Sequence, residues 1–129
     1  MILCPDNQYP ILRDGVDFIQ KHIFPGSLLM SNRRITEAMN ATGDLNLLDY
    51  EDMTPHYART LLEWRKNFLA VLPKVRALGY DPAFIRKWLY YLCYCEAGFG
   101  TRHISVAQAV YTRPDNLDLH SPAYDLGAR

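Results

Sequence analysis

The sequence predicts a helix-rich α/β fold. Long helices are predicted over residues 55–78 and 82–98, because apolar side chains recur there at three- and four-residue intervals. A strand is predicted over residues 104–112, where an apolar face alternates with a face of mostly small residues. The chain has 129 residues, of which 49% are apolar and 22% charged. These values are typical of one globular domain.

Composition excludes several classes of protein. The charges of fourteen basic and fourteen acidic residues cancel, so there is no excess positive charge of the kind that indicates nucleic-acid binding. The three cysteines do not form a disulfide framework, which favours a reducing cytoplasm. No segment approaches the ~20 apolar residues that cross a bilayer, and the start MILCPDNQYP is not a signal peptide. We expect a cytoplasmic protein whose surface, if compact, is about 7,000 Å².

The first half of the chain predicts two strands and two short helices. Residues 2–4 are typical of the end of a buried strand, and residues 45–50 of a second strand. A short amphipathic helix is predicted over residues 16–24, which Pro25-Gly26 ends. Ser31 is expected to cap another helix through Met39. The side chains expected to face inward are Val16, Phe18, Ile19 and Ile23 from the first helix, and Ile35, Ala38 and Met39 from the second.

Caps and prolines set the bounds of the long helices. Thr54 is the expected N-cap of the helix over 55–78, with Pro55 at its first position. Pro73 lies inside this pattern and predicts a kink or a break. Gly79 is placed to end the helix, and Asp81-Pro82 repeats the cap-and-proline start. The inward positions of the first long helix are Leu61, Trp64, Phe68, Leu72 and Val75.

The segment 88–95 is apolar or aromatic on all sides, so it is expected to be buried or to line an apolar cavity. Its Cys93-x-Cys95 pair does not make a zinc site, since zinc needs four ligands and positions i and i+2 of a helix face different ways. We expect two buried core cysteines and no metal. Gly98-Phe99-Gly100 resembles part of a dinucleotide-binding loop, but a helix precedes it where that motif needs a strand.

Three features have both a ligand-binding and a structural interpretation. The basic helix face over residues 59–76 could contact anionic lipid headgroups or simply face solvent. Tyr90, Tyr91 and Tyr94 could line an acyl channel or pack in a core. Tyr57 lies in the first turn of its helix, where the helix N-terminus favours anions. Its hydroxyl could donate a hydrogen bond to an anion there, or its ring could only pack. Pattern alone does not favour the ligand-binding alternatives.

Four sequence blocks carry more specific information than composition and periodicity do. They are VDFIQKHIFPGSLL, PHYARTLLEWRKNF, GYDPAFIRKWLYYLCYCEAGF and the closing strand ISVAQAVYTRP. In this order they resemble the C-terminal part of the cyclopropane-fatty-acyl-phospholipid synthase family, and the resemblance covers roughly residues 1–114. The combination of FIxxxIFPG with HYAxTLxxW is specific to that family.

The resemblance implies the C-terminal part of a Rossmann-like class I methyltransferase fold, comprising the last strands plus inserted helices. The family's enzymes transfer a methyl group from S-adenosylmethionine onto a cis double bond of a phospholipid acyl chain. The carbocation then loses a proton to bound bicarbonate and closes to a cyclopropane, although some relatives make other methylated lipids. Water would react with this carbocation, so the site must exclude water. Aromatic faces can stabilise the positive charge.

The resemblance also implies site residues. Tyr57 matches the tyrosine that helps to hold bicarbonate, while Ile2-Leu3-Cys4 stands where many members have His-Thr-Ile. Ser27 and Met30 replace the usual glycine and proline of the FPGGxLPS loop. With this family's lipid substrate, the residues expected to bind lipid are Phe24, Trp64, Tyr90, Tyr91 and Tyr94.

The family's glycine-rich cofactor loop has no counterpart in the sequence. We therefore expect a chain without the N-terminal cofactor half, inactive alone, which binds no S-adenosylmethionine and is completed by that half or by a complementary chain. Residues 1–114 would form the methyltransferase portion and residues 115–129 a loose tail. The alternative is a non-catalytic truncated relative that binds a lipid or a partner, in peripheral contact with an anionic membrane at its inner face.

Overall fold

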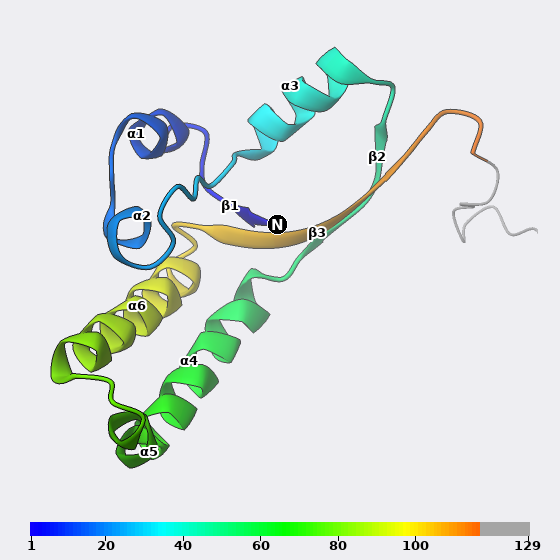
Figure 1. The fold of residues 1–129 in the computed structure, drawn as a ribbon. Coiled ribbons are helices and arrows are strands. Elements are labelled where there is room, and N and C mark those ends of the chain that lie inside the picture. The colour runs from blue at the N-terminus through cyan, green and yellow to red at the C-terminus, as the bar shows by residue number, and fades with distance from the viewer. Residues whose placement is uncertain (117–129) are drawn as a thin grey trace, which may run out of the picture.

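The computed structural model describes residues 1–116, in which a small sheet carries a long helical hairpin on one side and shorter helices on the other (Figure 1). The bounds are β1 Ile2–Leu3, α1 Tyr9–Asp14, α2 Phe18–His22, α3 Asn32–Thr42, β2 Asn46–Asp52, α4 Thr54–Ala70, α5 Leu72–Ala77, α6 Pro82–Gly100 and β3 Ser105–Thr112.

The sheet has the strand order β1-β3-β2. β3 is antiparallel to both neighbours, with Ile2 opposite Val106 and Asp52 opposite Ala107. The two outer strands are therefore parallel to each other, and helices connect them along the chain. All three predicted strands are confirmed. β3, the last in sequence, lies in the middle and holds together two strands that do not touch.

The α4–α6 hairpin contains the core. α4 and α6 lie side by side (Figure 1), and Leu61, Leu92 and Phe99 form its buried cluster, each at most 2% exposed. Outside this apolar seam the Arg65 guanidinium joins the Glu96 carboxylate of the facing helix at 2.8 Å. Apolar burial is the main source of stability at such a seam, so this cluster holds the two helices of the hairpin together.

The predicted break in the first long helix is confirmed. α4 ends at Ala70 and α5 begins at Leu72, with Pro73 in its first turn. The break precedes the proline by two residues, because proline lacks an N–H and is tolerated where that N–H would have no helical partner. Gly79, at φ +89°, then turns the chain toward α6. The Asp81 carboxylate caps α6 by accepting the Phe84 N–H at 2.7 Å.

The N-terminal helices differ from the prediction. α1 was not expected from the sequence; it begins with Pro10 in its first turn and has no buried residue. α2 is shorter than residues 16–24, because Asp17 and Gln20 form a capping box that fixes its start. Val16, predicted to face inward, lies before this cap and is 75% exposed.

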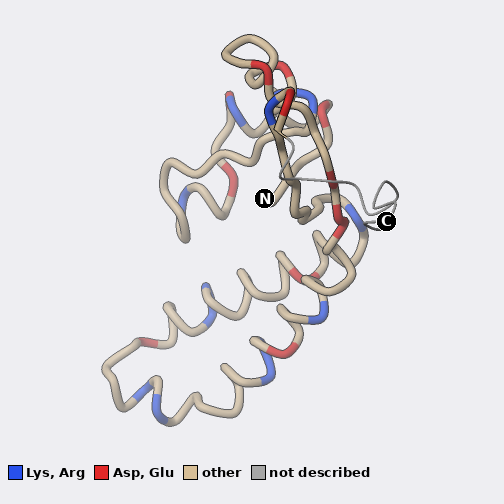
Figure 2. The backbone as a smooth tube through the Cα atoms, turned by 90° about the vertical axis from the view of Figure 1, so that its right-hand side faces the viewer, with Lys and Arg blue, Asp and Glu red and all other residues tan. Residues whose placement is uncertain are grey.

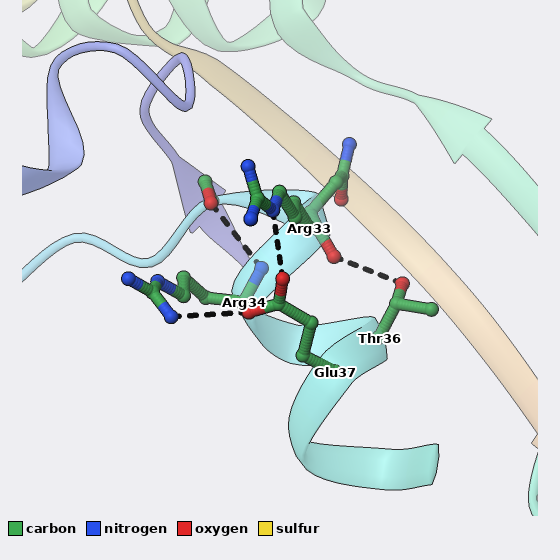
Figure 3. A network of polar contacts seen from close by, with 6 residues as sticks. Arg33, Arg34, Thr36 and Glu37 are labelled. Carbon is green, nitrogen blue, oxygen red and sulfur yellow. Dashed lines mark hydrogen bonds and ion pairs between the residues drawn. The ribbon is translucent and has the colours of Figure 1, made fainter.

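α3 confirms its predicted cap. The Arg34 N–H donates to Ser31 Oγ at 3.3 Å. One turn further on, Arg33 and Arg34 share the Glu37 carboxylate (Figure 3). Ile35 and Met39 are half-buried as expected, but Ala38 is exposed. The prediction for Ala38 is wrong because α3 packs along a narrower face than its pattern indicates.

The start of α4 corrects another prediction. The N-cap is Met53, and Thr54 is the first helical residue and is buried. The Asp52 carboxylate does the capping, since it accepts both the backbone N–H of Thr54 (2.9 Å) and its hydroxyl. Thr54 Oγ1 in turn accepts the Val106 N–H of β3 at 3.1 Å. The threonine therefore connects the helix to the sheet.

Exposure departs from the expectations in two respects. Cys93 is exposed and Cys95 only half-buried, so the prediction of two buried core cysteines is wrong; α6 turns only one side of its apolar segment inward. The accessible surface is 9407 Å², well above the compact value of about 7,000 Å². Within the described residues no helix is long and apolar enough to cross a bilayer. The predicted tail over 115–129 lies almost wholly outside the described residues.

Candidate functional site

A cavity of about 280 Å³ lies between the sheet end of the α4–α6 hairpin and the N-terminal segment. α4 and α6 supply one wall, and the end of β1, α1, α2 and the loop after α2 supply the other. Such a volume is near the lower end for small-molecule sites. The lining residues are Ile2, Cys4, Pro5, Gln8, Leu12, Asp17, Ile19, Gln20, Phe24, Ser27, Leu29, Tyr57, Leu61, Tyr91, Tyr94, Cys95, Phe99, His103 and Ile104.

Tyr57 is one of the residues that line this cavity. Its ring packs edge-on against Phe99, with ring centroids 4.8 Å apart, and against Trp64 at 6.2 Å. Its backbone N–H bonds to the Met53 carbonyl at 3.0 Å, which ties it to the start of α4. Its hydroxyl makes no hydrogen bond within the described residues. The ring is thus fixed while its polar atom remains available to a ligand.

The predicted lipid-binding residues fall into two groups. Phe24, Tyr91 and Tyr94 line the cavity, and Phe24 packs edge-on against Tyr91 with centroids 5.8 Å apart. Trp64 and Tyr90 lie outside the lining. Trp64, predicted to face inward, is instead 47% exposed, with its ring against Tyr57. Tyr90 packs on Phe18 of α2 at 4.5 Å.

The cavity disfavours the charged forms of the tyrosine and cysteine side chains that α6 contributes to its lining. Burial raises the pKa of Tyr91 to about 12 and that of the Cys95 thiol to about 11. Burial also raises the pKa of Tyr94. At neutral pH these groups are all neutral, so Cys95 is not the thiolate that nucleophilic catalysis requires. The environment suits an apolar ligand.

Gln20 shapes the wall that α1 and α2 contribute. Its side-chain amide donates to the Leu12 carbonyl at 3.1 Å and to the Ser27 carbonyl at 3.0 Å, while its oxygen accepts the Asp17 N–H. One side chain therefore joins α1, α2 and the following loop. The sequence pattern did not indicate Gln20, His103 or Ile104 as site residues. The capping box D-x-x-Q was the available signal for Gln20.

The glycines among residues 1–116 do not form a cofactor loop. The pair Gly98 and Gly100, which resembles such a loop in sequence, lies inside the last turn of α6. A Cβ on Gly98 would lie 3.2 Å from the Ile104 side chain, so this glycine serves close packing. No turn in the described part offers a glycine-rich cradle between a strand and a helix. No three metal-ligating side chains cluster among residues 1–116 either.

Comparison with known proteins gives a consistent result. The family model for mycolic acid cyclopropane synthetase matches residues 2–109. The tuberculostearic acid methyltransferase UfaA1 of Mycobacterium tuberculosis is 37% identical over 107 residues, which are 83% of this chain and 25% of that protein. The cyclopropane-fatty-acyl-phospholipid synthase of Escherichia coli is 34% identical over 96 residues, covering 74% of this chain and 24% of the enzyme.

Two solved structures share the fold. The cyclopropane synthase MmaA2 from Mycobacterium tuberculosis superposes with a TM-score of 0.74 at 23% identity, over 86% of this chain and 41% of that one. The mycolic acid cyclopropane synthase CmaA1, complexed with SAH and CTAB, superposes with a TM-score of 0.68 at 30% identity, over 73% of this chain and 32% of that one.

The matches cover most of this chain but only a part of each relative. The chain spans about a quarter of the length of the two sequence relatives. Its sheet and hairpin form part of a Rossmann-like class I methyltransferase fold, as predicted. With a family model matched over residues 2–109 and relatives above 30% identity, the chain belongs to the mycolic acid cyclopropane synthetase family.

Proposed function

We propose that this chain is the acyl-binding portion of a methyltransferase that transfers a methyl or methylene group from S-adenosylmethionine to the double bond of an unsaturated phospholipid acyl chain. The single observation that carries the proposal is the apolar cavity beside Tyr57. It combines aromatic walls and neutral tyrosines with the hydroxyl of Tyr57 in its lining. These features fit a hydrocarbon chain with one reactive position.

The chain's own residues would serve the reaction in three ways. The walls exclude water from the acyl chain, which protects a cationic centre from capture as an alcohol. The rings of Phe99, Tyr91 and Phe24 offer π-faces that stabilise such a centre. The free hydroxyl of Tyr57 would donate a hydrogen bond to bicarbonate. Bound there, bicarbonate supplies a base for the proton that leaves the methylated chain.

Because residues 1–116 contain no glycine-rich cradle for S-adenosylmethionine, we propose that this chain alone is inactive and that a cofactor-binding half completes the site. The second candidate function is a non-catalytic module that binds lipid or a partner. The observation that favours it is the same cavity, which needs no cofactor in order to bind an acyl chain.

Calorimetry with a monomeric cis-unsaturated fatty acid tests the acyl site. We expect saturable binding at one site per chain. Ser27→Phe should weaken it at least about tenfold, because the new ring would project into the cavity and displace the ligand's apolar contacts.

The matched control is Leu28→Phe, which places the same ring on the neighbouring residue, outside the lining. This variant should bind as the parent does. Absence of saturable heat with the parent, or equal loss in both variants, would contradict an acyl site in this cavity.

A further inference from the structure

We propose that the free end of the α4–α5–α6 hairpin docks on an anionic phospholipid surface. This hairpin tip comprises residues 69–87, namely the end of α4, α5, the turn and the start of α6. The inference rests on the proposed function, because an enzyme of phospholipid chains must reach them in a bilayer. The tip is the part of the hairpin farthest from the sheet (Figure 1).

The hairpin tip is strongly basic in a chain of zero net charge. It carries four bases and one acid, Asp81, and Figure 2 shows the bases at the end of the hairpin. The Asp81 carboxylate is occupied as the cap of α6. None of the four bases forms an ion pair within the described residues. They are Lys74 and Arg76 on α5, and Arg86 and Lys87 on α6.

The cations on the rest of the basic helix face are engaged in ion pairs. Arg59 and Lys66 both pair with Glu63, at 2.8 and 3.3 Å, and Arg65 pairs with Glu96. The basic face predicted over residues 59–76 is thus divided. Its first part forms ion pairs along and between the helices, and only its end keeps cations free for an external anion.

Apolar side chains lie exposed among these cations. Leu78 is 76% exposed, Tyr80 48%, Leu69 42% and Val71 39%. Exposed apolar groups next to Lys and Arg are typical of segments that lie in a membrane interface, where the apolar groups enter the acyl boundary and the cations reach the phosphates. An acidic protein would satisfy the charges and leave Leu78 without a role. The combination favours a lipid surface.

An aromatic path joins the hairpin tip to the cavity. Tyr80 stacks on Phe84 with centroids 4.3 Å apart, Phe84 on Trp88 at 5.8 Å, and Trp88 contacts Tyr91 at 5.2 Å. Tyr91 lines the cavity. From Phe84 to Tyr91 the path follows one side of α6 for about 10 Å at 1.5 Å per residue. A docked tip would therefore present the bilayer with a continuous apolar surface leading to the proposed acyl site.

Vesicle co-sedimentation tests the docking surface. The parent chain should bind equimolar phosphatidylglycerol–phosphatidylcholine vesicles at ~0.1 M salt and lose most binding at ~1 M, where the Debye length falls to about 3 Å. Lys74→Gln with Arg76→Gln should weaken partitioning about 30-fold, from two lost lipid contacts. Leu78→Ser should weaken it about tenfold.

The charge-matched control is Arg33→Gln with Arg59→Gln. Both arginines are exposed, and each carboxylate keeps a second basic partner, so binding should stay within about twofold. Equal weakening by the control, or no parent binding at low salt, overturns the inference. An unchanged Leu78→Ser variant would indicate a purely electrostatic partner and also overturns it.

The two proposals fail separately. Fatty-acid binding without vesicle binding would remove only the docking surface. Vesicle binding through the hairpin tip without saturable fatty-acid binding would remove the acyl site and leave a membrane contact. Circular dichroism of each variant shows that it retains the parent fold, so a loss of binding is assigned to the substituted surface.

Discussion

Tyr57 shows how one side chain is divided between packing and ligand binding. Its ring lies 4.8 Å from that of Phe99, while its hydroxyl has no partner in the described residues. The hydroxyl is therefore accessible to a ligand as well as to solvent. The bicarbonate-holding role that the family resemblance implies for Tyr57 stays a prediction.

We expect the hydroxyl of Tyr57 to contribute nothing to folding. Tyr57→Phe should leave the free energy of unfolding within about 0.5 kcal/mol of the parent. Tyr57→Ala should lower it by about 2 to 4 kcal/mol, because the ring contacts are lost. Urea unfolding measures both. A loss above about 1 kcal/mol in Tyr57→Phe would identify the hydroxyl as structural and contradict its assignment to a ligand.

Between elements, the decisive junction is Asp52, where β2, α4 and β3 meet. Hydrogen bonds from the Thr54 hydroxyl and backbone N–H, and then from Arg102, lower the pKa of Asp52 from 3.8 to about 2. The folded state therefore holds this proton less tightly than the unfolded chain does. The resulting stability is present above pH 4 and is lost as the pH falls toward 2.

Asp52→Asn tests this junction. The variant should have a lower urea midpoint than the parent at pH 7, and a smaller fall in midpoint between pH 4 and 2. Asp49→Asn, an exposed change in the same strand, should leave the parent's acid dependence unaltered. If both variants show the same dependence, the junction does not use the charge of Asp52.

At the scale of elements, the sequence predicts the features that depend on residues adjacent in the chain, such as helix caps and helix breaks. The caps Ser31 and Asp81 and the break at Pro73 are local, and all are confirmed. α1 was missed because six residues with no buried side chain show no period. Thr54 is not the predicted cap, because its hydroxyl accepts a hydrogen bond from Val106. That residue is 52 positions away, so a local pattern cannot show the bond. The cavity walls likewise join α2 to α6, and no sequence spacing shows such a contact.

For the molecule as a whole, cofactor binding determines whether the chain acts alone. The glycine that resembles a cofactor loop packs against Ile104, and the chain spans a quarter of its sequence relatives. We expect calorimetric titration of this chain with S-adenosylmethionine to give no saturable heat. Saturable binding would show that residues of this chain form a cofactor site and would contradict the proposed need for a second half.

The central position of β3 also determines the order of assembly. The backbone of Met1 bonds to Ala107, 106 residues away, whereas α4 and α6 follow each other closely in sequence. Closing the longer loop costs more chain entropy, and non-local contacts slow folding. We expect the hairpin to form first and the sheet to close last. During synthesis, β1 must therefore wait for its partner until nearly the whole described chain has left the ribosome.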